Sequence, residues 1–208
     1  MAFLLVLIIA FLLGSVPWGL VISKVFYGKD LRDEGSGNIG TTNAIRSMGK
    51  VGGYAVFVLD FGKGLLSGFV GVWVANAFGL DVTGVQVATA VAFFGCVYGH
   101  IFSPWLGFKG GKGIAVAIGC LFVTFGPVAS VIELLIFAVL VVATRYVSVG
   151  SIAAALACPF LALWVLWGNW PAIVLCAIAG LTVVWAHRGN FARLREGTER
   201  RIGDKKTR

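Results

Sequence analysis

The stretch that decides the fold class is residues 146–186, which reads YVSVGSIAAALACPFLALWVLWGNWPAIVLCAIAGLTVVWA. It contains no Asp, Glu, Lys or Arg, and only the turn-forming segment Gly168–Pro171 divides it. A helix crosses a bilayer with about 20 apolar residues at 1.5 Å each. The stretch therefore predicts two membrane-spanning helices joined by a short turn.

The composition of the whole chain agrees with this pattern. Of its 208 residues, 59% are hydrophobic and 12% are charged, whereas soluble domains carry about 25% charged residues. A soluble fold is excluded, and a β-barrel is disfavoured because the apolar runs are continuous rather than alternating. We predict an all-α polytopic membrane protein.

Other apolar runs supply the remaining spans. Residues 2–24, 54–78 and 82–98 each predict one, and the first is interpreted as a retained span because it lacks the basic start of a signal peptide. Residues 113–144 are too many for one ordinary span and are interrupted by Gly126-Pro127, so we interpret them as a hairpin of two short helices.

This hairpin gives seven transmembrane helices and places every basic loop on one side of the membrane. The formal net charge is +8, from 17 Lys and Arg against 9 Asp and Glu, and such loops tend to be cytoplasmic. The charge is therefore interpreted as topology rather than nucleic-acid binding, with the N-terminus outside and the C-terminus cytoplasmic. We expect one transmembrane domain, residues 1–197, and a basic cytoplasmic tail, residues 198–208.

The first cytoplasmic loop, residues 34–46, reads EGSGNIGTTNAIR. Its glycines allow the backbone to approach a ligand closely, and a helix start near Thr42 would point N–H groups at an anion. Arg46, about one turn later, is suited to clamping a phosphate. The alternative is a flexible loop that ends in a helix cap.

The second loop, residues 99–113, ends in Gly110-Gly111-Lys112-Gly113 just before the next apolar run. It is not a nucleotide-binding P-loop, because Leu106 stands where that pattern needs Gly and Gly113 where it needs Ser or Thr. A lysine beside glycine amides at a helix start still favours a phosphate. The alternative is an interfacial tryptophan with lysines that reach the membrane surface.

The third cluster follows the last span. His187 and Asn190 are three residues apart and share a face if the helix continues. A histidine with a pKa near neutrality can exchange a proton with a hydroxyl group. The alternative is a histidine that caps a helix C-terminus.

Charged residues within the spans have a structural interpretation. Asp60 and Lys63 are expected to pair as a brace, and Glu133 is expected to reach the outer membrane interface. The four cysteines are expected to be buried packing thiols.

In this order between apolar spans, the segments Ser36–Asn43, Gly99–Gly113 and His187–Glu196 resemble the three motifs of the PlsY family, the bacterial acyl-phosphate:glycerol-3-phosphate acyltransferases. The resemblance implies an enzyme of the bacterial inner membrane that starts phospholipid synthesis at a cytoplasmic active site. Its substrates would be acyl phosphate and glycerol 3-phosphate, its product lysophosphatidic acid, and it would need no cofactor or metal.

The same resemblance implies roles for individual residues. Ser36, Arg46 and Lys112 would hold glycerol phosphate, and His187 and Asn190 would orient its glycerol end. The donor phosphate would lie on a cradle formed by Gly37, Asn38, Gly40, Thr41, Thr42 and Asn43. It would also take the hydroxyl proton itself, so that no protein nucleophile is needed.

Two other classes of function remain as alternatives, a transporter or channel for an anionic solute and a lipid-phosphate phosphatase. The basic tail beyond Gly197 is covered least by the resemblance, and Arg200→Ala is expected to change activity little. The sequence defines neither the acyl-chain preference nor the oligomeric state.

Overall fold

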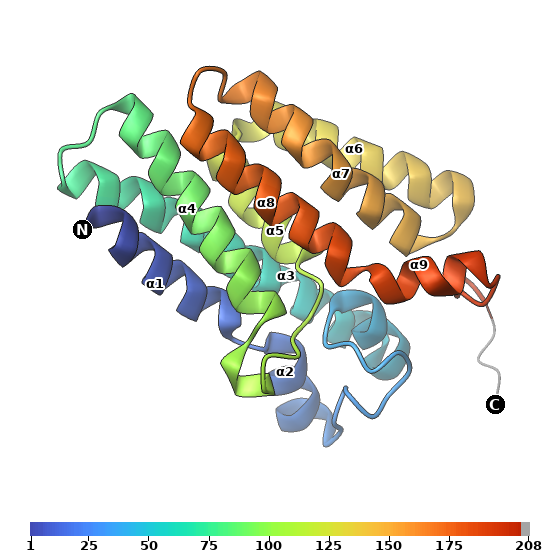
Figure 1. Cartoon of the computed structure of the whole chain (residues 1–208). Helices are drawn as coiled ribbons and strands as arrows, with labels where there is room; N and C mark the ends of the chain where they lie inside the picture. Colours follow the sequence, from blue (N-terminus) through green and yellow to red (C-terminus); the bar gives the residue numbers. More distant parts are fainter. Residues whose placement is uncertain (205–208) are drawn as a thin grey trace.

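The computed structural model describes residues 1–204, and these form helices and connecting loops without any β-strand. The long helices run side by side as one bundle (Figure 1). In chain order the helices are α1 (Ala2–Ser15), α2 (Trp18–Tyr27), α3 (Thr41–Ala77), α4 (Val82–Ile101), the short 3₁₀ helix η1 (Pro104–Leu106), α5 (Ile114–Thr124), α6 (Gly126–Thr144), α7 (Val147–Val165), α8 (Trp170–Ala186) and α9 (Arg188–Arg195).

The first predicted span is two helices rather than one, because the chain breaks at Val16-Pro17. Proline has no N–H to continue the helical hydrogen bonds, and it disfavours helical backbone in the residue before it. The freed carbonyl of Val16 accepts a hydrogen bond from Nζ of Lys63 at 2.7 Å. The break therefore provides a partner for a lysine buried inside the bundle.

The second predicted span is the later part of α3, which begins earlier than the apolar run. Its backbone is interrupted at Gly49, where φ is 78° and ψ is −176°. This conformation strongly favours glycine. The interruption separates a first segment, which carries Arg46, from the membrane-spanning segment.

The predicted hairpin in residues 113–144 is present as α5 and α6, which turn at Gly126 with φ of 77°. Five helices or continuous helix pairs are long and apolar enough to span a membrane, or six if α8 and α9, bent by 46°, count as one span. With 11 residues, α5 extends about 16 Å, which is shorter than the hydrocarbon core of a bilayer.

Glycines bring α5 into close contact with α3. A Cβ added to Gly64 would lie 2.1 Å from the carbonyl oxygen of Val116, and one added to Gly119 would lie 2.1 Å from that of Phe61. Small residues at such crossings are typical of helix packing in membranes, where close backbone approach supplies van der Waals contact.

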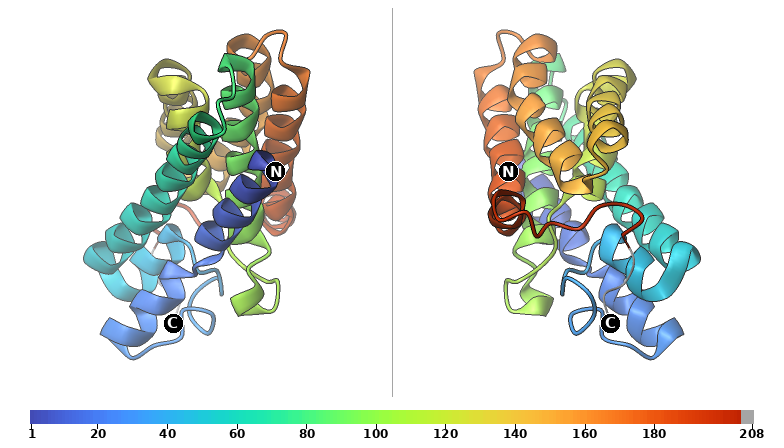
Figure 2. Two further views of the ribbon diagram at one scale, coloured as in Figure 1. Left: turned by 90° about the vertical axis from the view of Figure 1, so that its left-hand side faces the viewer. Right: turned by 90° about the vertical axis from the view of Figure 1, so that its right-hand side faces the viewer.

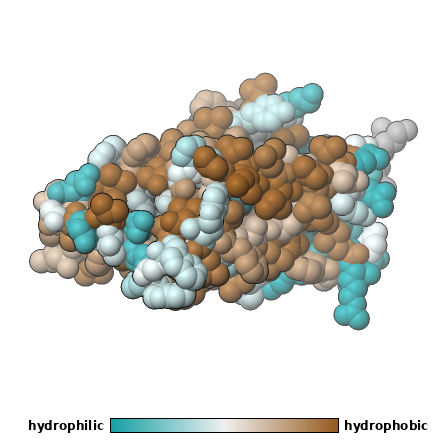
Figure 3. All heavy atoms as spheres, turned by 90° about the horizontal axis from the view of Figure 1, so that it is seen from above, coloured by the Kyte–Doolittle hydropathy of each residue, from teal (hydrophilic) through white to brown (hydrophobic). Residues whose placement is uncertain are grey.

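Helices α3, α4 and α6 pack against α5, and the outside of the bundle is apolar. Helices α6, α7 and α8 pack in sequence beside one another, and α2 lies with the loop of residues 28–40 at one end of the bundle (Figure 2). Hydrophobic residues cover most of the face shown in Figure 3, and hydrophilic ones gather toward its ends. Large side chains such as Phe160 and Trp164 are exposed on the outside, as expected for a surface that faces lipid.

Candidate active site

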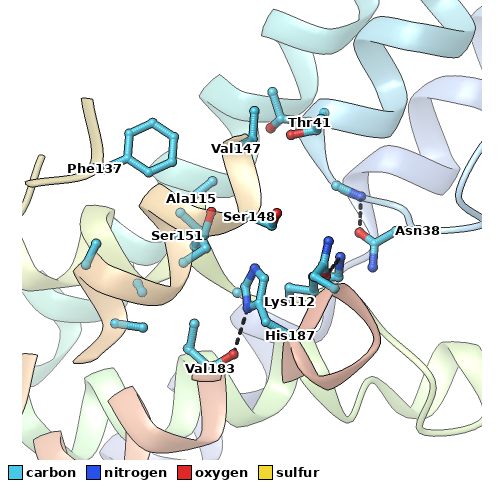
Figure 4. Close-up of a pocket in the computed structure, with 18 of the residues that line it drawn as sticks. Asn38, Thr41, Lys112, Ala115, Phe137, Val147, Ser148, Ser151, Val183 and His187 are labelled. Atoms are coloured by element: carbon cyan, nitrogen blue, oxygen red, sulfur yellow. Dashed lines mark hydrogen bonds between the residues drawn. The ribbon is translucent and has the colours of Figure 1, made fainter. Parts of the chain in front are cut away.

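A cavity of about 880 Å³ is lined by most of the residues that the sequence predicts to be functional. It is lined by the first loop, by Lys112 and by the segment after α8, and it continues between α5, α6, α7 and α8 into apolar surroundings. Figure 4 shows Asn38 and Thr41 toward one side of this pocket, Lys112 and His187 near its middle, and Phe137 on the far side.

All five predicted catalytic residues line this cavity, although they are as far apart as 154 positions in the sequence, from residue 36 to residue 190. Five of the six predicted cradle residues line it as well, but Gly37 does not. The contributing residues are Ser36, Arg46, Lys112, His187 and Asn190 together with Asn38, Gly40, Thr41, Thr42 and Asn43.

Asn43 holds the first loop in shape through its buried side chain. Its Oδ1 accepts a hydrogen bond from the backbone N–H of Ser36 at 2.9 Å. Its Nδ2 lies within 3.1 Å of the carbonyl oxygens of Leu31, Glu34 and Asn38. With both ends of the amide engaged by backbone, Asn43 is a positioning residue for the loop.

The rest of the loop presents polar groups to the cavity. Oδ1 of Asn38 accepts the N–H of Gly40 at 2.9 Å. The side-chain oxygen of Thr41 is buried and has no hydrogen-bond partner within residues 1–204. Since buried hydroxyl groups normally find partners, this oxygen is free for a ligand.

Lys112 points into the cavity from the loop before α5, and its Nζ donates a hydrogen bond to Oδ1 of Asn190 at 2.5 Å. Burial and, to a smaller extent, the nearby positive charge of Arg193 lower the pKa of Lys112 to about 8. The lysine retains a charge at neutral pH, and a bound anion would stabilise that charge.

His187 lies where the chain bends by 46° between α8 and α9. Its Nδ1 is 2.8 Å from the carbonyl oxygen of Val183, which can only accept, so Nδ1 carries the proton (Figure 4). Burial lowers the pKa of His187 to about 4. The ring is therefore neutral at pH 7, which leaves Nε2 as a hydrogen-bond acceptor.

Residues after α9 complete the site, although sequence reasoning placed them in a separate tail. Oε1 of Glu199 accepts from Nδ2 of Asn190, and its Oε2 pairs with Nε of Arg193, both at 2.7 Å. Burial alone would raise the pKa of Glu199, but hydrogen bonds, these two among them, and the positive charge of Arg193 outweigh it and lower the pKa. Arg200, which the sequence analysis assigned to the tail, also lines the cavity. The small effect expected of Arg200→Ala stays a prediction. Residues 205–208 of the predicted tail lie outside the described residues.

Sequence reasoning also missed Ser148, whose buried side chain from α7 lines the cavity (Figure 4). The sequence of residues 146–151 predicts only part of a membrane-spanning helix. It contains no feature that distinguishes this serine from a residue that packs inside the bundle.

The predicted pairing of Asp60 with Lys63 is confirmed at 2.9 Å, and both side chains are buried. His100 joins them, since its Nδ1 lies 3.0 Å from Nζ of Lys63. The cluster ties α3 to the end of α4 at the wall of the cavity. The prediction that Cys96, Cys120, Cys158 and Cys176 are buried thiols is confirmed as well.

No group of three or more His, Cys, Asp or Glu side chains in the described part of the chain could hold a metal ion. The polar end of the cavity is lined by cations, amides, hydroxyls and the carboxylate of Glu199, and the other end mostly by apolar side chains. Fold and site together define a multi-pass membrane protein with an internal cavity suited to an anionic headgroup and a hydrocarbon chain.

Comparison with known proteins names the family. The family model for glycerol-3-phosphate acyltransferase matches residues 4–197. The chain belongs to this family, as its resemblance to PlsY predicted.

Individual relatives agree along nearly the whole length. Glycerol-3-phosphate acyltransferase of Rhodopseudomonas palustris strain HaA2 is 43% identical over 201 residues, covering 96% of this chain and 95% of its own. That of Clostridioides difficile strain 630 is 33% identical, covering 99% and 98%. The crystal structure of PlsY, an integral membrane glycerol 3-phosphate acyltransferase, in its glycerol 3-phosphate form has a TM-score of 0.85 at 35% identity, covering 98% of this chain and 96% of its own. Its lysophosphatidic acid form has a TM-score of 0.81.

Proposed function

We propose that this protein transfers a fatty acyl group from acyl phosphate to glycerol 3-phosphate and releases lysophosphatidic acid and inorganic phosphate. The observation that carries the proposal is the single cavity in which three polar segments meet an apolar interior. Both substrates carry a phosphate, and one carries a hydrocarbon chain, so the two ends of the cavity suit the two chemical parts of this reaction.

Glycerol 3-phosphate would bind through Arg46, Lys112 and Ser36. Arg46 and Lys112 line the same cavity, and Asn190 holds Lys112 in place by accepting its hydrogen bond. An arginine and a lysine on one phosphate give charge-assisted hydrogen bonds, roughly twice as strong as neutral ones. Nε2 of neutral His187 would accept a hydrogen bond from the glycerol hydroxyl group and so orient its oxygen.

The donor phosphate would lie on the loop of residues 38–43 at the start of α3. Backbone N–H groups at a helix N-terminus and the side chain of Thr41 are ready for an anion there. Gly37 lies outside the cavity lining, so we leave it out of this contact and assign it to the shape of the loop, where its φ is 69°.

In the transfer step the glycerol hydroxyl oxygen forms a bond to the acyl carbonyl carbon, and the bond from that carbon to the phosphate oxygen breaks. The hydroxyl proton passes to the departing phosphate. Acyl phosphate is a mixed anhydride, so no protein nucleophile is required. The protein contributes proximity, worth about 7–11 kcal/mol in favourable cases, and electrostatic stabilisation of the developing charge.

For the topology we propose seven membrane segments with α5 as a short one, the N-terminus outside and the site facing the cytoplasm of the bacterial inner membrane. The positions of basic residues support this orientation, because the positive-inside tendency makes the end with basic loops cytoplasmic. The residues in or beside these loops are Lys29, Arg46, Lys112, Arg145 and those of the basic C-terminal segment.

The function is tested with purified protein in detergent or vesicles, supplied with glycerol 3-phosphate and hexadecanoyl phosphate in excess EDTA. Lysophosphatidic acid should form under these conditions and should not form when hexadecanoyl-CoA replaces the acyl phosphate. Product from the CoA donor at an equal rate would contradict the proposed donor and leave the acyltransferase assignment in place.

A further inference from the structure

The carboxyl group of Glu133 lies in the apolar part of the cavity. Glu133, from α6, lines the cavity but is only 6% exposed. Its neighbours in the lining include Leu134, Phe137 and Cys158. Its Oε2 has no hydrogen-bond partner among residues 1–204. The expectation that Glu133 reaches the membrane interface is therefore wrong.

The packing of α6 on α7 gives the depth of this carboxyl group. A Cβ added to Gly150 would lie 2.6 Å from the carbonyl oxygen of Phe137, so these two residues are level in the antiparallel pair. Glu133, four residues before Phe137, is then level with Ala154. Six residues separate Ala154 from Ser148, which corresponds to about 9 Å along the helix axis.

Helices α7 and α8 form one side of the cavity at this depth. A Cβ added to Gly180 would lie 3.1 Å from the carbonyl oxygen of Ala155 and 3.0 Å from Cβ of Cys158, so α7 and α8 are in contact here. An acyl chain that enters from the level of Ser148 would run between this side and α6, which carries Glu133.

An extended polypeptide advances about 3.5 Å per residue, which is three bonds, or about 1.2 Å per bond. We use the same advance per bond for an extended acyl chain. A chain whose carbonyl carbon, carbon 1, lies at the level of Ser148 therefore reaches Glu133 after roughly eight bonds, at about carbon 9 or 10. Plain hydrocarbon at that point excludes water and leaves the carboxyl group unpaired, which is unfavourable. A hydroxyl group at that point would pair with it.

We propose that Glu133 is a specificity-determining residue that selects acyl donors with a hydroxyl group near carbon 10 over unsubstituted donors of the same length. The selection rests on the proposed function, since it concerns the acyl chain of that reaction. The hydroxyl group donates to a carboxyl oxygen of Glu133. An unsubstituted chain must leave this oxygen without a partner.

The test compares 10-hydroxyoctadecanoyl phosphate with octadecanoyl phosphate as donors for the unmodified protein, Glu133→Leu and Glu133→Gln. The measured quantity is the ratio of kcat/KM for the hydroxylated and plain donors. Leucine removes the hydrogen-bonding group at similar size, and glutamine keeps one. We expect the ratio to be about tenfold higher in the unmodified protein than in Glu133→Leu, mainly through KM, and to be largely kept in Glu133→Gln.

An equal ratio in all three proteins would overturn the assignment of Glu133. If Glu133→Leu does not fold, Glu133→Met provides the same comparison with a more adaptable side chain. Octanoyl phosphate has an acyl chain that ends before Glu133. It therefore distinguishes failure of the proposed role of Glu133 from failure of the proposed function. Turnover of octanoyl phosphate with equal ratios rejects only the role of Glu133, and no turnover of any acyl phosphate rejects both proposals.

Discussion

The hydrogen bonds of Asn43 predict that this side chain maintains the first loop. Asn43→Ala removes the acceptor for the N–H of Ser36 at 2.9 Å and the donor that lies between three carbonyl oxygens. An amide has two N–H groups, so at most three well-formed bonds are lost. At about 1 kcal/mol net for each, and with water replacing part of them, the local loss is about 2 kcal/mol.

The assay is hydrogen–deuterium exchange of the amides in residues 34–40. Some of these amides exchange through local opening of the loop. A local loss of about 2 kcal/mol should raise their exchange rate roughly 30-fold. Asn43→Asp should behave similarly, because its carboxylate accepts from Ser36 but cannot donate to the carbonyl groups. The matched control is Asn38→Ala, which removes one bond to Gly40 and should accelerate exchange severalfold less. Unchanged exchange in Asn43→Ala would refute the positioning role.

Three further predictions concern the polar end of the cavity. Lys112 has a pKa of about 8 and is charged below that pH. The value of kcat/KM for glycerol 3-phosphate should therefore fall about tenfold between pH 7 and pH 9. In Lys112→Arg, kcat/KM should change little over this pH range. Arg46→Lys keeps the charge but loses the two-pronged contact, so steady-state kinetics should show a KM for glycerol 3-phosphate raised about tenfold; an unchanged KM would remove Arg46 from the site. His187→Ala should lower kcat by about 10²-fold with a normal melting temperature, whereas His100→Ala should mainly lower the melting temperature, because His100 lies in the buried cluster with Lys63.

The sequence predicted the membrane class and the three polar segments because both depend on local composition. Uninterrupted apolar runs define spans, and glycine, hydroxyl and basic residues stand out between them. It also predicted the pairing of Asp60 and Lys63, since residues three apart on a helix are neighbours.

Other features depend on contacts between distant segments and could not be read from local patterns. The segment after α9 folds back onto the bundle. One of the contacts that hold it there is a hydrogen bond from the N–H of Ile202 to the carbonyl oxygen of Arg145 at 2.8 Å. The resemblance assigned Asn43 to the phosphate cradle with its neighbours, and only the folded loop shows that its side-chain amide bonds to the backbone. The burial of Glu133 depends on which face of α6 meets α7, and the uniform hydrophobicity of α6 does not define that face.

The central claim is direct acyl transfer from acyl phosphate to glycerol 3-phosphate within one cavity, and a single-turnover experiment tests it most directly. Enzyme in excess is mixed with acyl-labelled hexadecanoyl phosphate, with and without glycerol 3-phosphate, and quenched at short times. The account predicts that phosphate and lysophosphatidic acid appear together and only when glycerol 3-phosphate is present, with no label on the protein. Phosphate release without glycerol 3-phosphate, accompanied by acyl label on the protein, would contradict it and indicate a covalent intermediate.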